Sequence, residues 1–91
     1  MKVGQVVMTR GVSLFVNKNK DCFAEINKYF LSYLNQDWGI LCEEDKLLND
    51  EALINGDRIL AKYHLSSIDR DIYIITEWDR SYTTILFPEE Y

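Results

Sequence analysis

The sequence is poor in the residues that divide a chain into separate parts. It holds a single proline, Pro88, and four glycines among 91 residues. It also has no Ser- or Gly-rich stretch, no internal repeat and no low-complexity segment. Linkers between domains are usually rich in Pro, Gly and Ser. These absences predict a single domain that spans residues 1–91.

Long apolar runs are missing as well. The longest, such as residues 72–75 and 85–87, fall far short of the roughly 20 residues that span a bilayer. Residues 1–9 hold one lysine and a short apolar patch that Gly4 and Gln5 interrupt, so they do not resemble a signal peptide. We therefore expect no membrane span, no export and a cytoplasmic location.

Cysteine and histidine are too few for a metal cage. Cys22 and Cys42 are the two cysteines and His64 is the single histidine, and their spacing matches no zinc site. Two free, buried thiols in a reducing compartment are the expected state. The calcium-loop and Gly-rich phosphate-loop patterns are absent too. The sequence thus predicts no metal site and no cofactor.

Basic residues are outnumbered, and they are unevenly placed. The chain has 10 Lys and Arg against 15 Asp and Glu, a net charge of −5. The first twenty residues hold four bases and no acid, so the remainder carries −9. Nucleic-acid binders cluster Lys and Arg against phosphates, and direct nucleic-acid binding is therefore disfavoured. Mimicry of DNA by the carboxylates of residues 43–51 is a minor alternative.

The residues that are present predict an α+β fold. With 47% apolar and 27% charged residues, the composition is that of an ordinary globular protein. Apolar side chains from Phe23 to Leu34 recur at helical spacing after a possible cap at Asp21, which predicts a buried-face helix over residues 22–35. A second helix is predicted over residues 43–54, because three acids stand at its start and Asn55-Gly56 at its end. We expect this second helix to lie on the surface of the sheet.

Residues that favour β-structure account for most of the rest of the chain. We expect an antiparallel meander after the helices and one strand before them. The predicted strands are residues 3–8, 58–65, 71–78 and 82–87. Residues 12–16 are apolar but short, and they fit either a helical turn or another strand. The predicted architecture is a two-layer sandwich, in which an antiparallel sheet of order β-α-α-β-β-β packs against two helices.

The hairpin of residues 74–84 is the most unusual local sequence. It gathers two acids, a guanidinium, several hydroxyls and an indole around one turn. Arg80 can clamp a carboxylate or phosphate while Asp79 and Glu77 orient it, although the same residues also suit a purely structural turn. Trp38 is either a core residue or an exposed anchor. The candidate binding residues are Arg10, Trp38, Glu77, Trp78, Asp79, Arg80 and Thr83.

Catalytic patterns do not stand out. His64 is followed by Ser66 and Ser67, but a catalytic triad also needs a strained nucleophile turn and an oxyanion hole, which leave no trace in the sequence. A strand histidine with one polar edge is the expected role. We assign no catalytic residue.

Several short motifs, taken together, resemble a known family. These are Met8-Thr9-Arg10-Gly11, Asp37-Trp38-Gly39, Glu44-Asp45, Asn49-Asp50, Arg58-Ile59-Leu60 and the whole of residues 74–91. They are similar to a family of small bacterial proteins found on plasmids and other mobile elements. Members are sometimes labelled plasmid-related proteins or type I restriction modification subunits, but 91 residues cannot hold a methyltransferase. The resemblance implies a setting of conjugation, phage and restriction, in which small acidic proteins often bind other proteins.

Three functions remain in competition. The first is a non-enzymatic protein-interaction or regulatory protein of a bacterial mobile element, with a protein partner. The second is a small domain that binds an anionic ligand, or an enzyme, with a pocket lined by Arg10, Arg58, Glu77, Asp79, Arg80 and Thr83. The third is a homo-oligomeric structural protein whose edge strand, residues 3–8, pairs with its twin.

Overall fold

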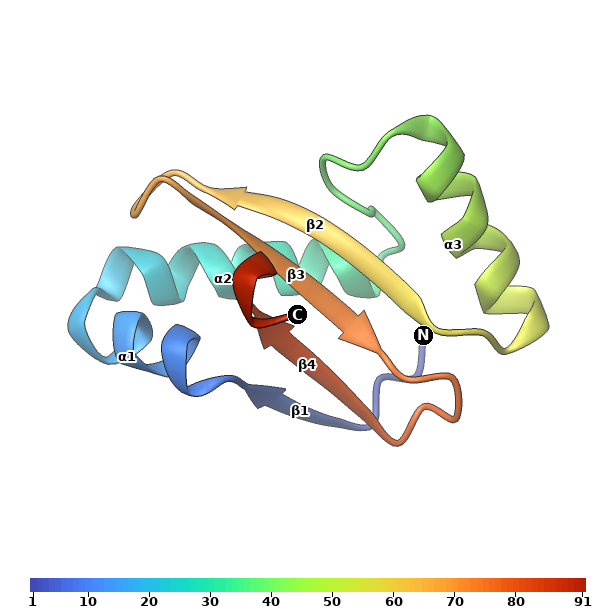
Figure 1. Ribbon diagram of the computed structural model, residues 1–91, viewed down its shortest axis with the longest axis horizontal. Coiled ribbons are helices and arrows are strands. Elements are labelled where there is room, and N and C mark those ends of the chain that lie inside the picture. The colour runs from blue at the N-terminus through green and yellow to red at the C-terminus, as the bar shows by residue number, and fades with distance from the viewer.

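Three α-helices and four β-strands make up the chain, and the computed structural model describes all residues 1–91 (Figure 1). The α+β class is confirmed. In chain order the elements are β1 (Gln5–Met8), α1 (Arg10–Lys18), α2 (Lys20–Leu34), α3 (Glu43–Asn55), β2 (Ile59–Leu65), β3 (Arg70–Thr76), β4 (Tyr82–Leu86) and the 3-10 turn η1 (Pro88–Glu90). None of the helices is long and apolar enough to cross a membrane.

The strands form one mixed sheet in the order β1-β4-β3-β2. Strands β2, β3 and β4 make the predicted antiparallel meander. Strand β1, however, runs parallel to β4, with Gln5 opposite Tyr82 and Met8 opposite Ile85. The prediction of a purely antiparallel sheet is therefore wrong. Strand direction at β1 depends on the path of the three helices between it and the meander, which a local pattern does not reveal.

The N-terminal helices differ from the sequence prediction at their boundaries. Residues 12–16, which fit either a helical turn or another strand by their sequence, belong to α1, where the Thr9 hydroxyl accepts a hydrogen bond from the Val12 amide. Asn19 ends α1 and caps α2, because its side chain accepts from the amides of Asp21 and Cys22 at 3.0 and 3.2 Å. The predicted cap at Asp21 is thus wrong, and there are three helices in place of two.

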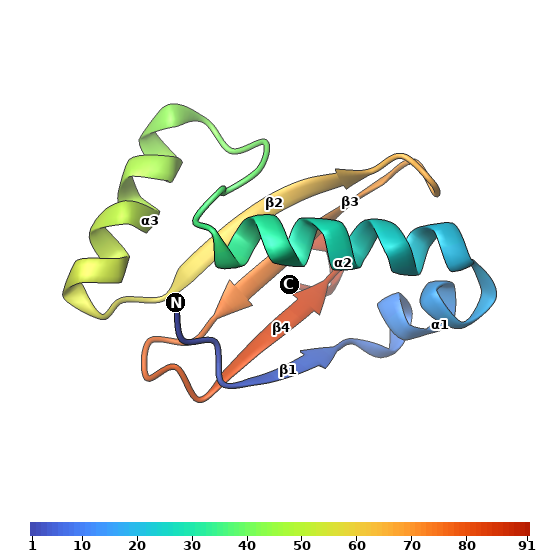
Figure 2. The ribbon, with the colours of Figure 1, turned by 180° about the vertical axis from the view of Figure 1, so that it is seen from behind.

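Helix α2 crosses one face of the sheet, as Figure 1 shows from the front and Figure 2 from behind. Its Ile26 and Tyr33 side chains are fully buried against inward-facing residues of the strands. Two predicted burials fail: Phe23 is 46% exposed, and Cys42 is exposed while Cys22 is buried. The prediction of a buried face is thus correct at Ile26 and Tyr33 and wrong at Phe23, near the start of the helix.

Helix α3 stands beside the edge strand β2 and does not lie on the sheet surface, contrary to the prediction (Figure 1). The Asn49 side chain donates to the Leu60 carbonyl at 2.7 Å and accepts from the Leu60 amide at 3.2 Å. Further along β2, the amide of Lys62 donates to the Trp38 carbonyl and that of Ile40 to the Lys62 carbonyl. The outer edge of β2 is therefore covered by residues 38–40 and by Asn49.

Candidate functional site

The structure scatters the seven residues that the sequence singled out. Trp38 and Thr83 are buried, and Trp78 is exposed at the hairpin between β3 and β4. Arg10 opens α1 at the other end of β1. Only residues 77–80 lie together, so the seven do not form one pocket.

Arg80 is committed to the main chain. Its guanidinium donates to the carbonyls of Asp57, Glu77 and Ala52 at 2.7, 3.0 and 3.2 Å. Ala52 and Asp57 belong to the C-terminal end of α3 and the turn after it, where the helix dipole is negative. Arg80 therefore holds the hairpin against the end of α3, which leaves little of its guanidinium for an anion.

Asp79 shapes the same hairpin. Its carboxylate accepts hydrogen bonds from the Ser81 hydroxyl at 2.6 Å and the Ser81 amide at 3.1 Å, a local turn. These hydrogen bonds lower the pKa of Asp79. Arg80 itself sits in the left-handed region, at φ 60°. Asp79 and Arg80, two members of the predicted anion clamp, thus both stabilise the turn.

Thr83 belongs to a buried chain of hydroxyl groups. The Tyr33 and Thr76 hydroxyls lie 2.6 Å apart, those of Thr76 and Thr83 lie 2.7 Å apart, and Thr83 donates to the Val3 carbonyl at 2.7 Å. Because a carbonyl only accepts, the donors must run in order from Tyr33 through Thr76 to Thr83. Burial raises the pKa of Tyr33 to about 12. The chain ties α2, the sheet and the N-terminal segment together.

Of the two roles predicted for Trp38, a core residue or an exposed anchor, the structure shows the core residue. Its ring packs edge-on against Tyr33 with the centroids 5.6 Å apart. Its indole N–H donates to the Asp50 carboxylate at 2.9 Å. This hydrogen bond holds α3 in place, as do the hydrogen bonds of Asn49 and Arg80. Ala52 and Asn49 are the buried residues of α3, so the helix is positioned largely by hydrogen bonds.

The apolar side chains of α3 consequently face solvent. Leu47 is 60% and Ile54 is 85% exposed, and Trp78 of the adjoining hairpin is 67% exposed. Residues seven apart lie on the same face of a helix, so Leu47 and Ile54 form one stripe, which Asp50 and Glu51 interrupt. We call the exposed residues Leu47, Leu48, Ile54 and Trp78 the α3 end. A helix that lies on the sheet, as predicted, would bury its apolar side chains, and this exposed surface was therefore not expected.

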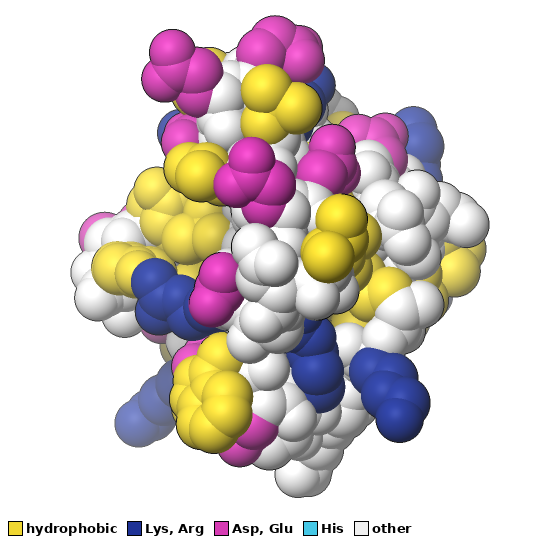
Figure 3. All heavy atoms as spheres, turned by 90° about the vertical axis from the view of Figure 1, so that its right-hand side faces the viewer, with side chains coloured by type: hydrophobic (Ala, Val, Ile, Leu, Met, Phe, Trp, Pro, Cys, Tyr) yellow, Lys and Arg dark blue, Asp and Glu magenta, His cyan; other side chains and the backbone are white.

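Acidic side chains surround this apolar stripe. Helix α3 carries five acids and one lysine, a net charge of −4. Figure 3, which faces this end of the molecule, shows hydrophobic and acidic side chains interleaved in its upper half, with single basic side chains scattered mostly over its lower half. The surface thus combines exposed apolar groups with a negative field.

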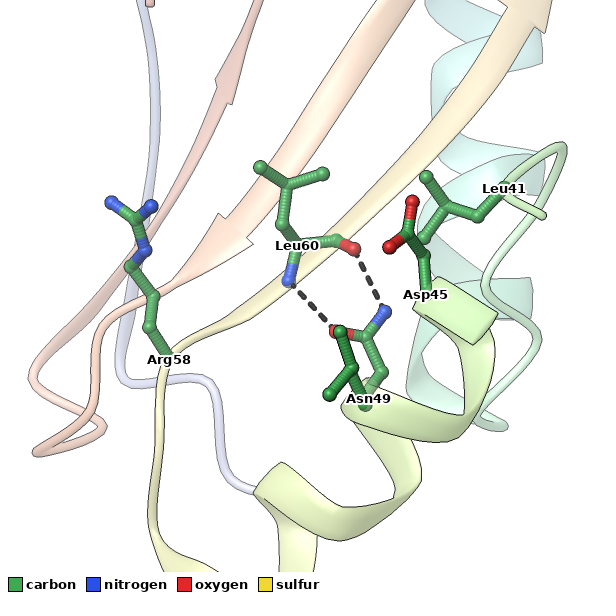
Figure 4. Close-up of a pocket in the computed structure, with 6 residues that line it drawn as sticks. Leu41, Asp45, Asn49, Arg58 and Leu60 are labelled. Atoms are coloured by element: carbon green, nitrogen blue, oxygen red, sulfur yellow. Dashed lines mark hydrogen bonds between the residues drawn. The ribbon is translucent and has the colours of Figure 1, made fainter. Parts of the chain in front are cut away.

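A shallow groove separates α3 from β2 (Figure 4). It has a volume of about 290 Å³, and its lining residues are Leu41, Asp45, Leu48, Asn49, Arg58 and Leu60. Arg58 also borders a second hollow of about 330 Å³ on the sheet face that α2 leaves open, together with Glu77, Tyr82 and Tyr91. Of the six residues predicted to line an anion pocket, Arg58 and Glu77 reach this hollow. The other four point elsewhere.

His64 has the polar surroundings expected of a strand histidine. Its Nδ1 lies 2.7 Å from an Asp71 carboxylate oxygen, and its Nε2 lies 3.2 Å from one of Asp69. The hydrogen bond to Asp71 raises the pKa of His64. Both ring nitrogens face carboxylates, and no nucleophile adjoins them. No group of three or more His, Cys, Asp or Glu side chains could hold a metal ion.

Ser66 and Ser67 form hydrogen bonds with Glu25 and not with His64. The Glu25 carboxylate accepts from the Ser66 amide and hydroxyl at 2.8 Å and from the Ser67 amide at 3.0 Å. Partial burial raises the pKa of Glu25, but the hydrogen bonds from Ser67 and Ser66 outweigh it and lower the pKa to about 2. Glu25 thus fastens the β2–β3 turn to α2.

Acid should loosen this contact. Because the folded pKa of about 2 lies below the unfolded value of about 4.3, the Glu25 contribution is complete above that value and is lost as pH falls towards 2. We expect Glu25→Gln to reduce stability at pH 6 and to show a smaller further loss between pH 5 and pH 2.5 than wild type. Urea midpoints at the three pH values measure this. Parallel losses in both proteins would contradict the assigned role.

Comparison of the chain with protein-family models, with curated proteins and with solved structures found no match.

Proposed function

We propose that the chain is a non-enzymatic protein-interaction domain that presents the α3 end to a partner protein. The observation that carries this proposal is the exposure of Leu47, Leu48 and Ile54 on α3 and of Trp78 on the hairpin that contacts the end of α3. Large apolar side chains gathered on a surface commonly mark binding sites. Tryptophan is also among the residues that contribute most to interface energy.

The geometry of α3 favours recognition in a groove of the partner. A helix that docks in a groove uses residues at spacings of three, four and seven, and Leu47 and Ile54 have the spacing of seven. The net charge of −4 on α3 favours a partner groove rimmed by Lys and Arg. Because polar contacts of Asn49, Trp38 and Arg80 fix the helix in advance, little ordering is required on binding.

The resemblance to small proteins of plasmids and other mobile elements supplies a setting for this proposal. We accordingly place the domain in the bacterial cytoplasm, as a regulator of a protein that takes part in conjugation, phage defence or restriction. Arg80, Asp79 and Trp38 then act by positioning the α3 end, and Trp78 contacts the partner directly.

A paired set of variants tests the proposal. Leu47→Ser/Ile54→Ser removes the apolar stripe, and Leu31→Ser is the control, because Leu31 on α2 has the same 60% exposure as Leu47. All three positions are exposed, so we expect melting temperatures close to that of wild type. Each protein is crosslinked to its partners in a lysate of the source cell and recovered by affinity capture.

We expect one partner to be recovered with wild type and with Leu31→Ser, and to fall at least tenfold with the double variant. Mutating the partner's basic groove residues should cause the same loss. Equal recovery with all three proteins, or no recovered partner, would refute the proposed function.

A further inference from the structure

Strand β1 leaves its outer edge unpaired. It is the terminal strand in the order β1-β4-β3-β2, and Figures 1 and 2 show no element beyond it. The opposite edge, at β2, is covered by residues 38–40 and by Asn49. The fold therefore protects one edge of the sheet and exposes the other.

The hydrogen-bond pattern identifies the free groups on β1. The Gln5 amide donates to the Ser81 carbonyl at 3.2 Å and the Thr9 amide donates to the Ile85 carbonyl at 3.0 Å. In a parallel pair alternate residues bond the neighbouring strand, so Val6 and Met8 direct their N–H and C=O groups away from β4. The edge thus offers two donors and two acceptors at the spacing of a strand.

The usual devices that block an exposed edge are missing from β1 apart from its shortness. Its sequence, Gln-Val-Val-Met, contains no proline and no charged side chain, both of which commonly protect edges. Val6 is 42% and Val7 is 37% exposed, and they face opposite sides of the sheet. An added strand could therefore pack apolar side chains on either face.

Two basic residues flank this edge, and one acid, Glu90, reaches the end of β1, where its carboxylate accepts from the Thr9 hydroxyl at 2.7 Å. Lys2 precedes β1 and Arg10 follows it, both are exposed, and neither takes part in an ion pair. No acid occurs in the first twenty residues. Antiparallel pairing with a second copy, centred on Val6, would bring Arg10 of one copy opposite Lys2 of the other. Like charges across strands are destabilising, so a second copy fits this edge poorly.

We propose that the outer edge of β1 binds an extended peptide segment with apolar residues at its centre and acidic residues at its ends, which adds a fifth strand to the sheet. Main-chain hydrogen bonds to Val6 and Met8 supply affinity, and the charges of Lys2 and Arg10 select acidic flanks. This site is distinct from the α3 end, and its existence does not depend on the function proposed above.

The test uses the full chain and two synthetic peptides. The first is acetyl-Glu-Glu-Val-Thr-Val-Thr-Glu-Glu-amide, and the second replaces its four glutamates with lysines. Titration into ¹⁵N-labelled protein, followed by NMR, should show shifts confined to β1 and its flanks, with slowed exchange of the Val6 and Met8 amides. We expect the acidic peptide to bind at least tenfold more tightly than the basic one, and more weakly as salt is raised.

Two matched variants locate the contact. Val6→Pro removes an outward N–H at a position where an edge strand tolerates proline, and should weaken binding at least tenfold. Val6→Thr keeps that N–H and should bind as wild type does. Because Val6→Pro can also disturb folding, Lys2→Glu/Arg10→Glu provides an independent variant that should reverse the preference between the two peptides.

Three results would overturn the proposal. These are equal binding of both peptides to wild type, unchanged binding to the Val6→Pro and charge-reversed variants, and a wild-type dimer in light scattering that Val6→Pro dissociates. The last result would assign the edge to a second copy of the chain.

Discussion

Replacing Gly39 with alanine is expected to lower the free energy of unfolding by about 3 kcal/mol or more. Gly39 has φ +79°, and a Cβ there would lie 1.9 Å from the Lys62 carbonyl oxygen and 2.8 Å from Cδ1 of Tyr63. The first of these neighbours is main chain within β2, so it cannot move without breaking the pairing of residues 38–40 with that strand. The variant therefore loses the contact of residues 38–40 with β2 and also strains the backbone at position 39.

Gly56→Ala is the matched control. Gly56 has nearly the same conformation, φ +75°, but no atom lies within 4 Å of the position of an added Cβ. Only the left-handed backbone then disfavours alanine, at about 1–2 kcal/mol. Urea unfolding of both variants measures the difference. Equal losses would show that residues 38–40 do not pack closely on β2.

Arg80→Ala should also be strongly destabilising. It removes three charge-assisted hydrogen bonds to the carbonyls of Ala52, Asp57 and Glu77, two of which are partly buried. Allowing for water that replaces some of them, we expect a loss of about 2–4 kcal/mol. For a domain of this size that lowers the melting temperature by roughly 8–32 °C.

Two further variants separate geometry from charge at this position. Arg80→Lys keeps the positive charge near the end of α3 but cannot span three carbonyls, so its melting temperature should fall between those of wild type and Arg80→Ala. Arg10→Ala removes the same charge from an exposed position and should change stability by about 0.5 kcal/mol or less. An Arg80→Ala protein that melts like wild type and yet loses its partner would show that Arg80 is a binding residue.

The local pattern of the sequence was sufficient to predict the meander and helix α2. In β2 the buried positions Ile59, Ala61, Tyr63 and Leu65 alternate with more exposed ones, which is the period of a half-buried strand. In α2 the buried Ile26 and Tyr33 are two helical turns apart. Both periods are written into neighbouring residues, so no long-range knowledge is needed to recognise them.

The remaining features depend on contacts between distant residues. The direction of β1 is set by its pairing with β4, about eighty positions later. The position of α3 is set by Asn49, which bonds β2, and by Arg80, which reaches back to Ala52. The sequence around Asn49 and Arg80 does not reveal which distant residues these side chains contact.

The candidate site was predictable in part. The hairpin of residues 74–84 was predicted as a candidate site, but the role of each side chain depends on what it contacts in the fold. The exposed stripe left a usable signal: Leu47, Leu48, Leu53 and Ile54 do not gather on one side of the helix. A helix with apolar residues on two sides buries one set and offers the other to a partner.

Hydrogen exchange of the free chain and of the chain bound to its captured partner would locate the interface directly. We predict that binding slows exchange in α3 and in residues 77–80, and leaves α2 unchanged. Slowed exchange confined to α2 or to the open sheet face, with α3 unaffected, would contradict the proposal that this helix is the partner-binding element.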